Sequence, residues 1–268
     1  EENGGAQALI CSEIGSEGSR TIPVKPICEF NARWLALLAR VQTQPGSMHI
    51  ALVGGGAGGV ELILAIQKRL RHELSLLDKD PNTLKFSLFT RGATILPTHN
   101  HSVQRRFIQT LRSRGIALHA NAAVVAVDDS GLTTVNGEYH SVDEVIWVTR
   151  AGGASWLKET GLSLDADGFI EVTNTLQTIT DQNIFAAGDV ATMVNHPREK
   201  AGVFAVRQGQ PLARNLRRSL ENNSLRDYHP QRNWLALIST GDTYAVASRG
   251  NFFAAGAWLW RWKDFIDR

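Results

Sequence analysis

A glycine-rich turn between an apolar strand and a helix is the feature that most constrains this chain. Residues 49–53 form a short apolar run, residues 60–77 have a helical pattern, and between them stands Gly54-Gly55-Gly56-Ala57-Gly58-Gly59. In a G-x-G-x-x-G pattern, Gly54 permits a tight turn, Gly56 lets the backbone approach a pyrophosphate, and Gly59 lets the helix pack against the strand. The pattern predicts a dinucleotide-binding turn, and a merely flexible turn is the alternative.

Composition and charge exclude several classes of protein. The chain has 268 residues, 43% of them hydrophobic and 20% charged, which is typical of one large or two modest globular domains. The net charge of +2 gives no reason to expect nucleic acid as a partner. Cys11 and Cys28 form neither a CxxC nor a zinc-binding pattern, which favours reduced thiols and a cytoplasmic location. No apolar run has the length of a transmembrane segment.

Strand and helix patterns alternate from Met48 onwards, which predicts an α/β fold with a Rossmann-like doubly wound parallel sheet. Strands are expected at residues 85–89 and 116–119, and helices at 30–41 and 102–114. Short β segments separated by turn signals predict an antiparallel β excursion, and they lie at residues 122–127, 133–135 and 142–148.

A second candidate ligand site lies at Gly188-Asp189. Residues 183–187 predict a buried strand that ends there, and open α/β sheets bind ligands at the carboxyl ends of their strands. Gly-Asp is also a common turn sequence, so a simple turn is the alternative. A helix is expected over residues 201–220, with a buried stripe of Val203, Val206, Leu212 and Leu216. A hairpin around residues 240–242 and an aromatic-rich helix from Gly256 predict a small α+β C-terminal region.

Three motifs together resemble the pyridine nucleotide-disulphide oxidoreductases, flavoproteins with two dinucleotide-binding domains. The first is the G-x-G-x-x-G-x-E turn that ends at Glu61. The second is the apolar strand before Thr149-Arg150-Ala151-Gly152, similar to the family's A-T-G-like turn except for Arg150. The third is T-x6-apolar-A-x-G-D, from Thr178 to Asp189. Residues 200–209 are similar to type II NADH dehydrogenase and sulfide:quinone reductase relatives. Residues 24–27, 230–242 and 260–268 resemble a subgroup fused to selenophosphate synthetase.

The resemblance implies an FAD-dependent NAD(P)H oxidoreductase that passes electrons to an unknown acceptor. It implies that NAD(P)H binds at the glycine-rich turn and at Thr149, and that Asp189 bonds the ribityl chain of FAD beside Gly188. Lys200, Ala201 and Gly202 would begin a helix next to the flavin. Glu61 would lie near the nicotinamide as the catalytic residue, although a carboxylate that favours the helix dipole is an equal alternative.

The resemblance also predicts a division of the chain and a missing part. The expected divisions are 1–45, the tail of a flavin domain and a linker helix; 46–155, the NAD(P)-binding domain; 156–222, the closing half of the flavin domain; and 223–268, a C-terminal hairpin and helix. No second glycine-rich turn precedes residue 48, and the chain begins at Glu1. We therefore expect a fragment that lacks the ADP-binding half of the flavin site, that binds FAD weakly or not at all, and that is inactive when isolated.

Several side chains leave alternatives open. Thr90 and Arg91 follow the second strand where a carboxylate would select NADH, so their identity favours NADPH, and a solvated arginine is the alternative. The H-x-H pair of His99 and His101 favours a loop or helix cap over a metal site. Lys200 and Gln208 would contact flavin or acceptor, or lie on the surface.

Two rival functions remain. One is a non-catalytic nucleotide-binding module of a selenophosphate synthetase fusion. The other is a membrane-peripheral NADH:quinone or sulfide:quinone reductase, whose anchor would contain Trp258, Trp260 and Trp262. These tryptophans alternate by two, which suits a helical membrane face poorly. We therefore favour their packing against a flavin domain or a fused domain.

Overall fold

The computed structural model describes residues 21–24, 27–148 and 152–267. These residues divide into two compact units, one made of residues up to 149 together with 235–268, and the other of residues 150–234. The turn residue Thr149 lies outside the described residues, and the four predicted domain divisions stay predictions.

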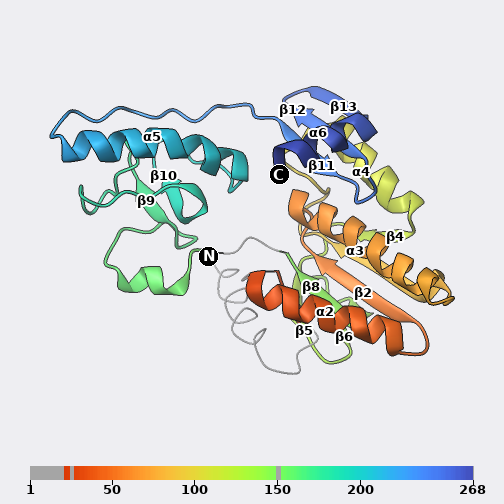
Figure 1. Cartoon of the computed structure of the whole chain (residues 1–268). Helices are drawn as coiled ribbons and strands as arrows, with labels where there is room; N and C mark the ends of the chain where they lie inside the picture. The colour runs from red at the N-terminus through yellow and green to blue at the C-terminus, as the bar shows by residue number, and fades with distance from the viewer. Residues whose placement is uncertain (1–20, 25–26, 149–151, 268) are drawn as a thin grey trace. The chain divides into compact units, whose positions relative to one another are not determined.

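A parallel sheet of five strands forms the centre of the first unit (Figure 1). Its order is β1 (Thr21–Pro23), β8 (Glu144–Trp147), β2 (Met48–Val53), β3 (Leu84–Phe89) and β4 (Ile116–His119). The sheet has β1 at one edge, where Pro23 is tolerated because an edge strand leaves part of its ladder unpaired. The sheet confirms the predicted α/β class.

Opposite faces of the sheet are covered by different elements. In β2, Ile50 and Leu52 point into the core beneath the helices, whereas Ala51 and Val53 point into a second core on the other face. This alternation follows from the two-residue period of a strand. The helices of the unit are α2 (Ile27–Thr43), α3 (Ala57–Leu76) and α4 (His101–Ser113), with a 3-10 turn at Pro81–Thr83. The opposite face carries the antiparallel strands β5 (Val124–Val127), β6 (Gly131–Thr134) and β7 (Tyr139–Ser141). The antiparallel excursion is thus confirmed for β5 and β6, whereas β7 was not predicted and the predicted segment 142–148 is β8 of the parallel sheet.

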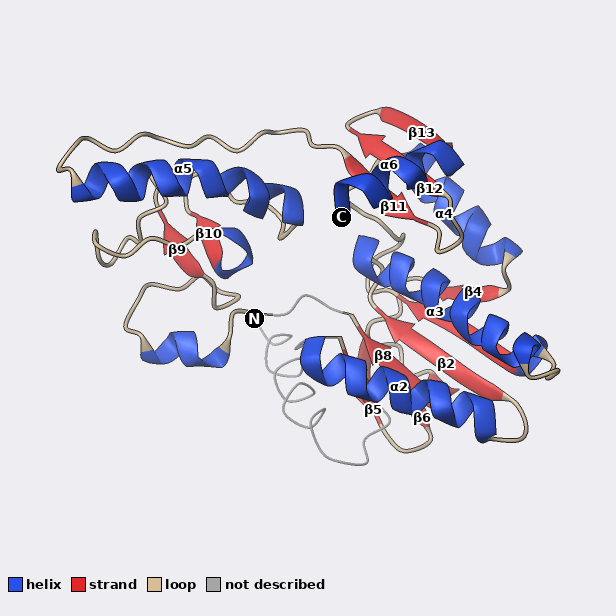
Figure 2. Ribbon diagram, in the orientation of Figure 1, coloured by secondary structure: helices blue, strands red, loops and turns tan. Residues whose placement is uncertain are grey.

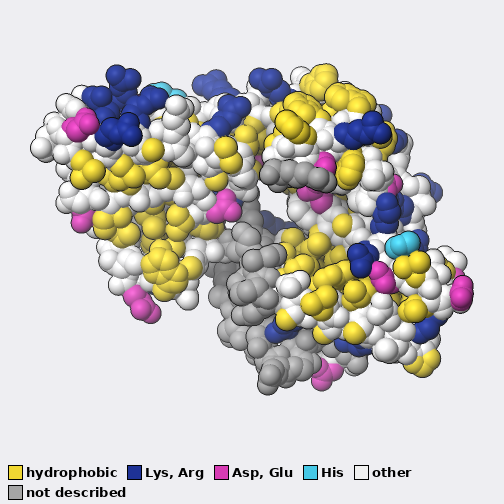
Figure 3. All heavy atoms as spheres, viewed as in Figure 1, with side chains coloured by type: hydrophobic (Ala, Val, Ile, Leu, Met, Phe, Trp, Pro, Cys, Tyr) yellow, Lys and Arg dark blue, Asp and Glu magenta, His cyan; other side chains and the backbone are white. Residues whose placement is uncertain are grey.

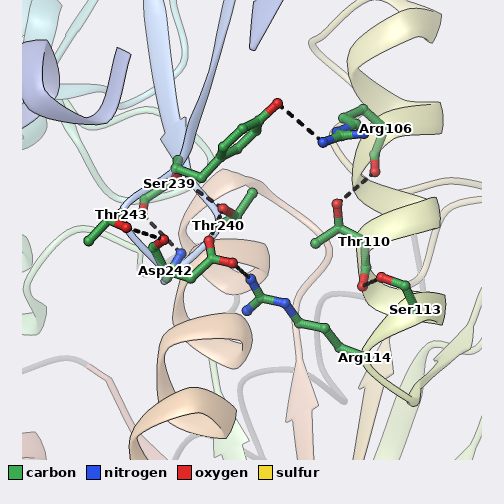
Figure 4. A network of polar contacts seen from close by, with 10 residues as sticks. Arg106, Thr110, Ser113, Arg114, Ser239, Thr240, Asp242 and Thr243 are labelled. Carbon is green, nitrogen blue, oxygen red and sulfur yellow. Dashed lines mark hydrogen bonds and ion pairs between the residues drawn. The ribbon is translucent and has the colours of Figure 1, made fainter. Parts of the chain in front are cut away.

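The C-terminal region packs on the helices of the first unit. It consists of β11 (Ala236–Ser239), β12 (Ala245–Arg249), β13 (Phe252–Gly256) and α6 (Ala257–Asp267). The β11–β12 hairpin and the aromatic helix confirm the prediction, and β13 is a strand that the sequence did not predict. Figure 4 shows the contacts of the hairpin turn: Asp242 pairs with Arg114 at the end of α4, and the hydroxyl of Tyr244 accepts a hydrogen bond of 3.2 Å from Arg106.

The second unit has little regular β structure beside one long helix (Figure 2). Its elements are the 3-10 turns Ser155–Glu159 and Gly188–Val190, the parallel pair β9 (Ile170–Val172) and β10 (Ala191–Met193), and α5 (Gly202–Leu220). The strand predicted at residues 183–187 is wrong. Within the described residues this segment makes a single antiparallel bridge, between Gln177 and Phe185. The 3-10 turn Gly188–Val190 begins three residues after Phe185, so the segment is too short to form a ladder.

The predicted buried stripe of α5 is wrong at Val206 and Leu216, whereas Leu212 is partly buried against the core of the unit, as predicted. Val206 and Leu216 are 80% and 42% exposed, whereas Phe204, Gln208 and Asn215 are buried. The buried face therefore includes two side-chain amides that a hydrophobic pattern cannot identify. Asn215 can be buried because its amide nitrogen donates to the carbonyls of residues 175 and 226, and its oxygen accepts from the N–H of residue 226.

Candidate functional site

The glycine-rich turn has the contacts that its motif requires. Gly54 has φ of +134°, a conformation that favours glycine, and its N–H donates to the carbonyl of Phe89 at 2.9 Å. A Cβ on Gly59 would lie 1.9 Å from the carbonyl oxygen of Gly54, so α3 begins too close to the turn for any side chain there. This contact confirms the close packing of helix and strand that the sequence predicts.

Gly56 faces open space instead. A Cβ at this position would meet no atom within 4 Å. Gly56 is also the N-cap of the 20-residue helix α3, and it provides no side-chain cap for the N–H groups of the first turn. Uncapped N–H groups and the positive end of a helix dipole attract a phosphate. Open space at Gly56 therefore fits a pyrophosphate, and Gly58, with only Val148 at 4.0 Å, leaves similar room.

Thr90 forms a wall of this turn. A Cβ on Gly55 would lie 2.4 Å from the hydroxyl oxygen of Thr90, and Thr90 is buried. The carbonyl of Gly55 accepts a hydrogen bond of 2.7 Å from the N–H of Leu96, which fixes the loop after β3 against the turn. Arg91, the next residue, is exposed. The structure thus places Thr90 in the packing of the turn and leaves Arg91 at its rim.

Glu61 has a partner that neither interpretation of the sequence includes. Its carboxylate accepts a hydrogen bond of 2.6 Å from the backbone N–H of Ser239, at the end of β11. The second turn of α3, where Glu61 lies, is thereby joined to the C-terminal sheet. No sequence pattern indicates this bond, because the two residues are 178 positions apart. A role of Glu61 at the nicotinamide stays a prediction.

The residues predicted for the flavin site lie together in the second unit. Gly188 has φ of +74° and begins the turn that contains Asp189, whose side chain is exposed. A shallow hollow of about 20 Å³ is lined by both residues and by Lys200 and Ala201. Ligand pockets usually measure roughly 300–1,000 Å³, so these residues form one wall and enclose nothing.

Lys200 and Gln208 have definite partners on this wall. The ammonium of Lys200 donates to the carbonyl of Ala191 at 2.6 Å and to the hydroxyl of Thr192 at 2.9 Å, and it lies 4.0 Å from the centre of the Phe169 ring. Gln208 is buried and accepts a hydrogen bond from Gly188. A surface position for Gln208, one of the two alternatives from the sequence, is therefore wrong. Gly202, by contrast, has open space where a Cβ would stand.

The H-x-H pair belongs to a loop and a helix cap, as predicted. The side chain of Asn100, between the two histidines, accepts hydrogen bonds of 3.1 Å from the N–H groups of Ser102 and Val103 and so caps α4. His99 contacts the hydroxyl of Ser248 at 2.9 Å. Among the residues that the structure describes, no group of three or more His, Cys, Asp or Glu side chains is placed to hold a metal ion.

A histidine cluster that no sequence pattern indicates lies on the sheet face opposite the helices. The ring of His119 stacks on Phe89, with ring centres 4.4 Å apart, and His140 meets both rings edge-on. Burial lowers the pKa of His119, and the neighbouring His140 and His49 lower it further. Burial likewise lowers the pKa of His49. The three residues come from β2, β4 and β7, which only the folded topology brings together.

The C-terminal helix exposes an apolar stripe. Trp258, Trp262, Phe265 and Ile266 are exposed, whereas Leu259 is buried beneath the sheet and Trp260 packs beside it. Figure 3 shows hydrophobic side chains gathered over β13 and α6 on the visible face. Trp258 and Trp262 therefore share one face of the helix, and Trp260 takes the other. No helix within residues 21–24, 27–148 and 152–267 is long and apolar enough to cross a membrane.

Comparison with known proteins gives a family and a common fold. A model of the family "Pyridine nucleotide-disulphide oxidoreductase" matches residues 14–209. The type II NADH:quinone oxidoreductase of Haemophilus influenzae is 26% identical over 220 residues, which are 78% of this chain and 46% of that protein. The chain thus spans about half the length of this relative.

Solved structures show the same fold. The sulfide:quinone oxidoreductase of Aquifex aeolicus has a TM-score of 0.72 at 18% identity, over 94% of this chain and 64% of that one. An engineered water-forming NADPH oxidase bound to NADPH has a TM-score of 0.61 at 20% identity, over 87% of this chain and 48% of that one.

Proposed function

The chain belongs to the pyridine nucleotide-disulphide oxidoreductase family, and from this we propose that it carries the NAD(P)H site and one wall of the flavin site of an FAD-dependent oxidoreductase. One observation carries the proposal. In the glycine-rich turn, Gly59 has no room for a side chain, whereas Gly56, at the uncapped start of α3, faces open space. This is the combination that a bound pyrophosphate requires.

The nucleotide would be held from two sides. Gly56 and Gly58 would face the pyrophosphate, and Arg91, exposed at the end of β3, would meet a 2′-phosphate, which favours NADPH over NADH. Thr90 would shape this side by packing on Gly55. Thr149 is proposed for the same site from the family resemblance.

The second unit would contribute to the flavin. Asp189 would bond the ribityl chain, while Gly188 and the start of α5 at Lys200, Ala201 and Gly202 would lie beside the ring system. A bound flavin supplies the capacity to accept a hydride from the reduced nicotinamide and to pass electrons to an acceptor. We propose Glu61 as the residue near that transfer, with the alternative that it serves only to join α3 to β11.

Nucleotide titration tests the proposal. We expect NADPH to bind more tightly than NADH, measured by calorimetry. Gly56→Val fills the space of the pyrophosphate without meeting another atom, so it should weaken NADPH binding at least tenfold and leave the unfolding temperature within a few degrees. Gly209→Val, a substitution into similarly open space on α5, is the control. A chain that binds neither nucleotide, or a Gly56→Val variant that binds normally, contradicts the proposal.

A membrane-peripheral quinone reductase is a second candidate, favoured by the exposed stripe on α6. Tryptophan and phenylalanine on one face of an amphipathic helix suit the boundary between headgroups and acyl chains. The chain should sediment with vesicles of phosphatidylglycerol and phosphatidylcholine, and replacing Trp258 and Trp262 by serine should release it. Replacing the exposed Val135 by serine is the control. A wild-type chain that stays in the supernatant removes this candidate.

The association with selenophosphate synthetase and the non-catalytic alternative rest on the family resemblance alone. We propose a fused or associated synthetase as the partner, and the complete reading frame of the gene is the direct test. A non-catalytic module would bind NADPH but show no flavin-dependent reduction of an artificial acceptor in the complete protein. Turnover by the complete protein would remove that alternative.

A further inference from the structure

We infer that Gln208 is a positioning residue that fixes the Gly188-Asp189 turn, and thereby sets the affinity of the proposed flavin site. The inference rests on the proposed function for its consequence, but not for its geometry. The side-chain oxygen of Gln208 accepts a hydrogen bond of 2.6 Å from the N–H of Gly188. Gln208 comes from the second turn of α5, twenty residues further along the chain.

The bond is partly buried, and its acceptor side chain is the buried member. Gln208 is 7% exposed, so an N–H that lost this acceptor would stand against a buried side chain. A buried donor without a partner costs more than a bond exchanged with solvent. The turn has only three residues and begins at Gly188, whose φ is +74°. Because so short a turn has few hydrogen bonds of its own, its conformation depends on the bond from Gly188 to Gln208.

A second contact from the same helix face supports the assignment. A Cβ on Gly188 would lie 3.4 Å from the Cβ of Ala205, three residues before Gln208 on α5. Residues three apart share one face of a helix. Ala205 therefore limits how closely the turn approaches α5, and Gln208 holds it at that distance. Both line the same hollow as Asp189.

The other buried amide of α5 has a different task. Asn215 bonds the backbone at residues 175 and 226, away from the hollow, and so joins distant parts of the unit. Gln208, by contrast, accepts its hydrogen bond from the turn that carries the proposed flavin ligand. Gln208 acts through Gly188, whereas Asp189 would touch the flavin itself.

Hydrogen exchange in the complete 268-residue chain tests the geometry without any flavin. Gln208→Leu keeps the size of the side chain and removes the acceptor. We expect the exchange of the Gly188 amide to rise about tenfold relative to the amides of β9, as for the loss of one buried hydrogen bond. Gln208→Glu keeps an acceptor oxygen in either protonation state and should restore slow exchange. Gln210→Leu, an exposed position on the same helix, is the control.

An FAD titration of the same variants tests the consequence. The dissociation constant for FAD should rise about tenfold in Gln208→Leu and stay unchanged in Gln208→Glu and Gln210→Leu. Unchanged exchange at Gly188 in Gln208→Leu overturns the inference, as does faster exchange with an unaltered dissociation constant. Where the wild-type chain binds FAD too weakly to titrate, as expected for a wall around a hollow of about 20 Å³, the exchange result alone decides the role of Gln208.

Discussion

The two glycines that limit the pyrophosphate turn have opposite tolerance for a side chain. At Gly59 a Cβ would overlap the carbonyl oxygen of Gly54, which belongs to the backbone and cannot rotate away. At Gly56 the same atom would enter free space. Substitutions at the two positions therefore separate a structural requirement from a binding requirement.

Gly59→Ala should destabilise the fold. Relief of the overlap requires α3 to move away from β2, and overpacking of this kind costs roughly 1–3 kcal/mol or more. We expect a lower midpoint of urea unfolding than for the wild-type chain. Gly209→Ala, inside α5 with open space around it, should leave the midpoint equal or higher, since alanine favours the helix. Equal midpoints for Gly59→Ala and wild type would contradict the crossing of α3 over the turn.

The stacked histidine cluster should make stability depend on pH below neutrality. Burial lowers the pKa of both His119 and His49 in the folded chain, so below the ordinary value of about 6.5 the unfolded chain binds more protons. Stability is then complete above about pH 6.5 and is lost as the pH falls from there through the lowered pKa. Asp143 and Glu138 oppose these shifts, and Lys85 and His140 reinforce them.

The measurement is the unfolding temperature between neutral and mildly acidic pH. Replacement of His119 by phenylalanine preserves the stack on Phe89 and removes one titrating group, so the acid-induced decrease should shrink. The effect should not exceed about 2–4 °C, because solvent screens half-buried groups. His72→Asn, at an exposed site on α3, should leave the decrease unchanged. An identical decrease in wild type and His119→Phe would contradict this origin.

At the level of elements, the contacts that hold the C-terminal hairpin are spread over two helices. Glu61 bonds Ser239, Arg114 pairs with Asp242, and a Cβ on Gly241 would lie 2.9 Å from the backbone of α3 at residues 64 and 65 (Figure 4 shows the Arg114 side). The ion pair is partly exposed, so it contributes little by itself. The close approach of Gly241 and the buried Ile238 and Val246 contribute more to the packing.

A pair of substitutions at Glu61 separates its structural bond from a catalytic role. Glu61→Leu leaves the N–H of Ser239 without its acceptor and should destabilise the fold by about 1–3 kcal/mol, measured by urea unfolding. Glu61→Gln keeps an acceptor oxygen and should retain most of the stability. If Glu61→Gln also lowers turnover of the complete protein while stability persists, the carboxylate acts at the nicotinamide. Equal destabilisation by both variants would show that charge, and not the hydrogen bond, is what matters.

Elements with a strong hydrophobic period were predictable, and elements defined by polar partners were not. The strands β2 and β3, helix α4 and the β11–β12 hairpin follow from apolar periodicity and turn residues. The buried face of α5 does not follow from apolar periodicity, because Gln208 and Asn215 are buried through hydrogen bonds to backbone groups that only the fold brings near. The glycine-rich turn is a local pattern and was predicted correctly. The bond from Ser239 to Glu61 was not, because it joins residues 178 positions apart that only the fold brings together.

For the molecule as a whole, the two proposed cofactor sites differ in how much of each the described residues provide. The nucleotide turn is complete in its backbone: a tight turn, a close helix and an uncapped helix start, all within the first unit. The flavin residues lie in the second unit around a hollow of about 20 Å³, far below the volume of a ligand pocket. The affinities of the chain for the two cofactors should differ accordingly.

We expect the purified 268-residue chain to bind NADPH while it retains no stoichiometric flavin. A wall that buries little of a large ligand gains little free energy, and association costs several kcal/mol before any net affinity appears. The flavin absorbance of the purified chain and of the same sample after dialysis against excess FAD provides the measurement, with NADPH titration of that sample as the check that it is folded. Asp189→Asn should leave NADPH binding unchanged and weaken any residual FAD binding. A yellow chain with one flavin per polypeptide would mean that the described wall, or the residues around it, encloses the cofactor after all.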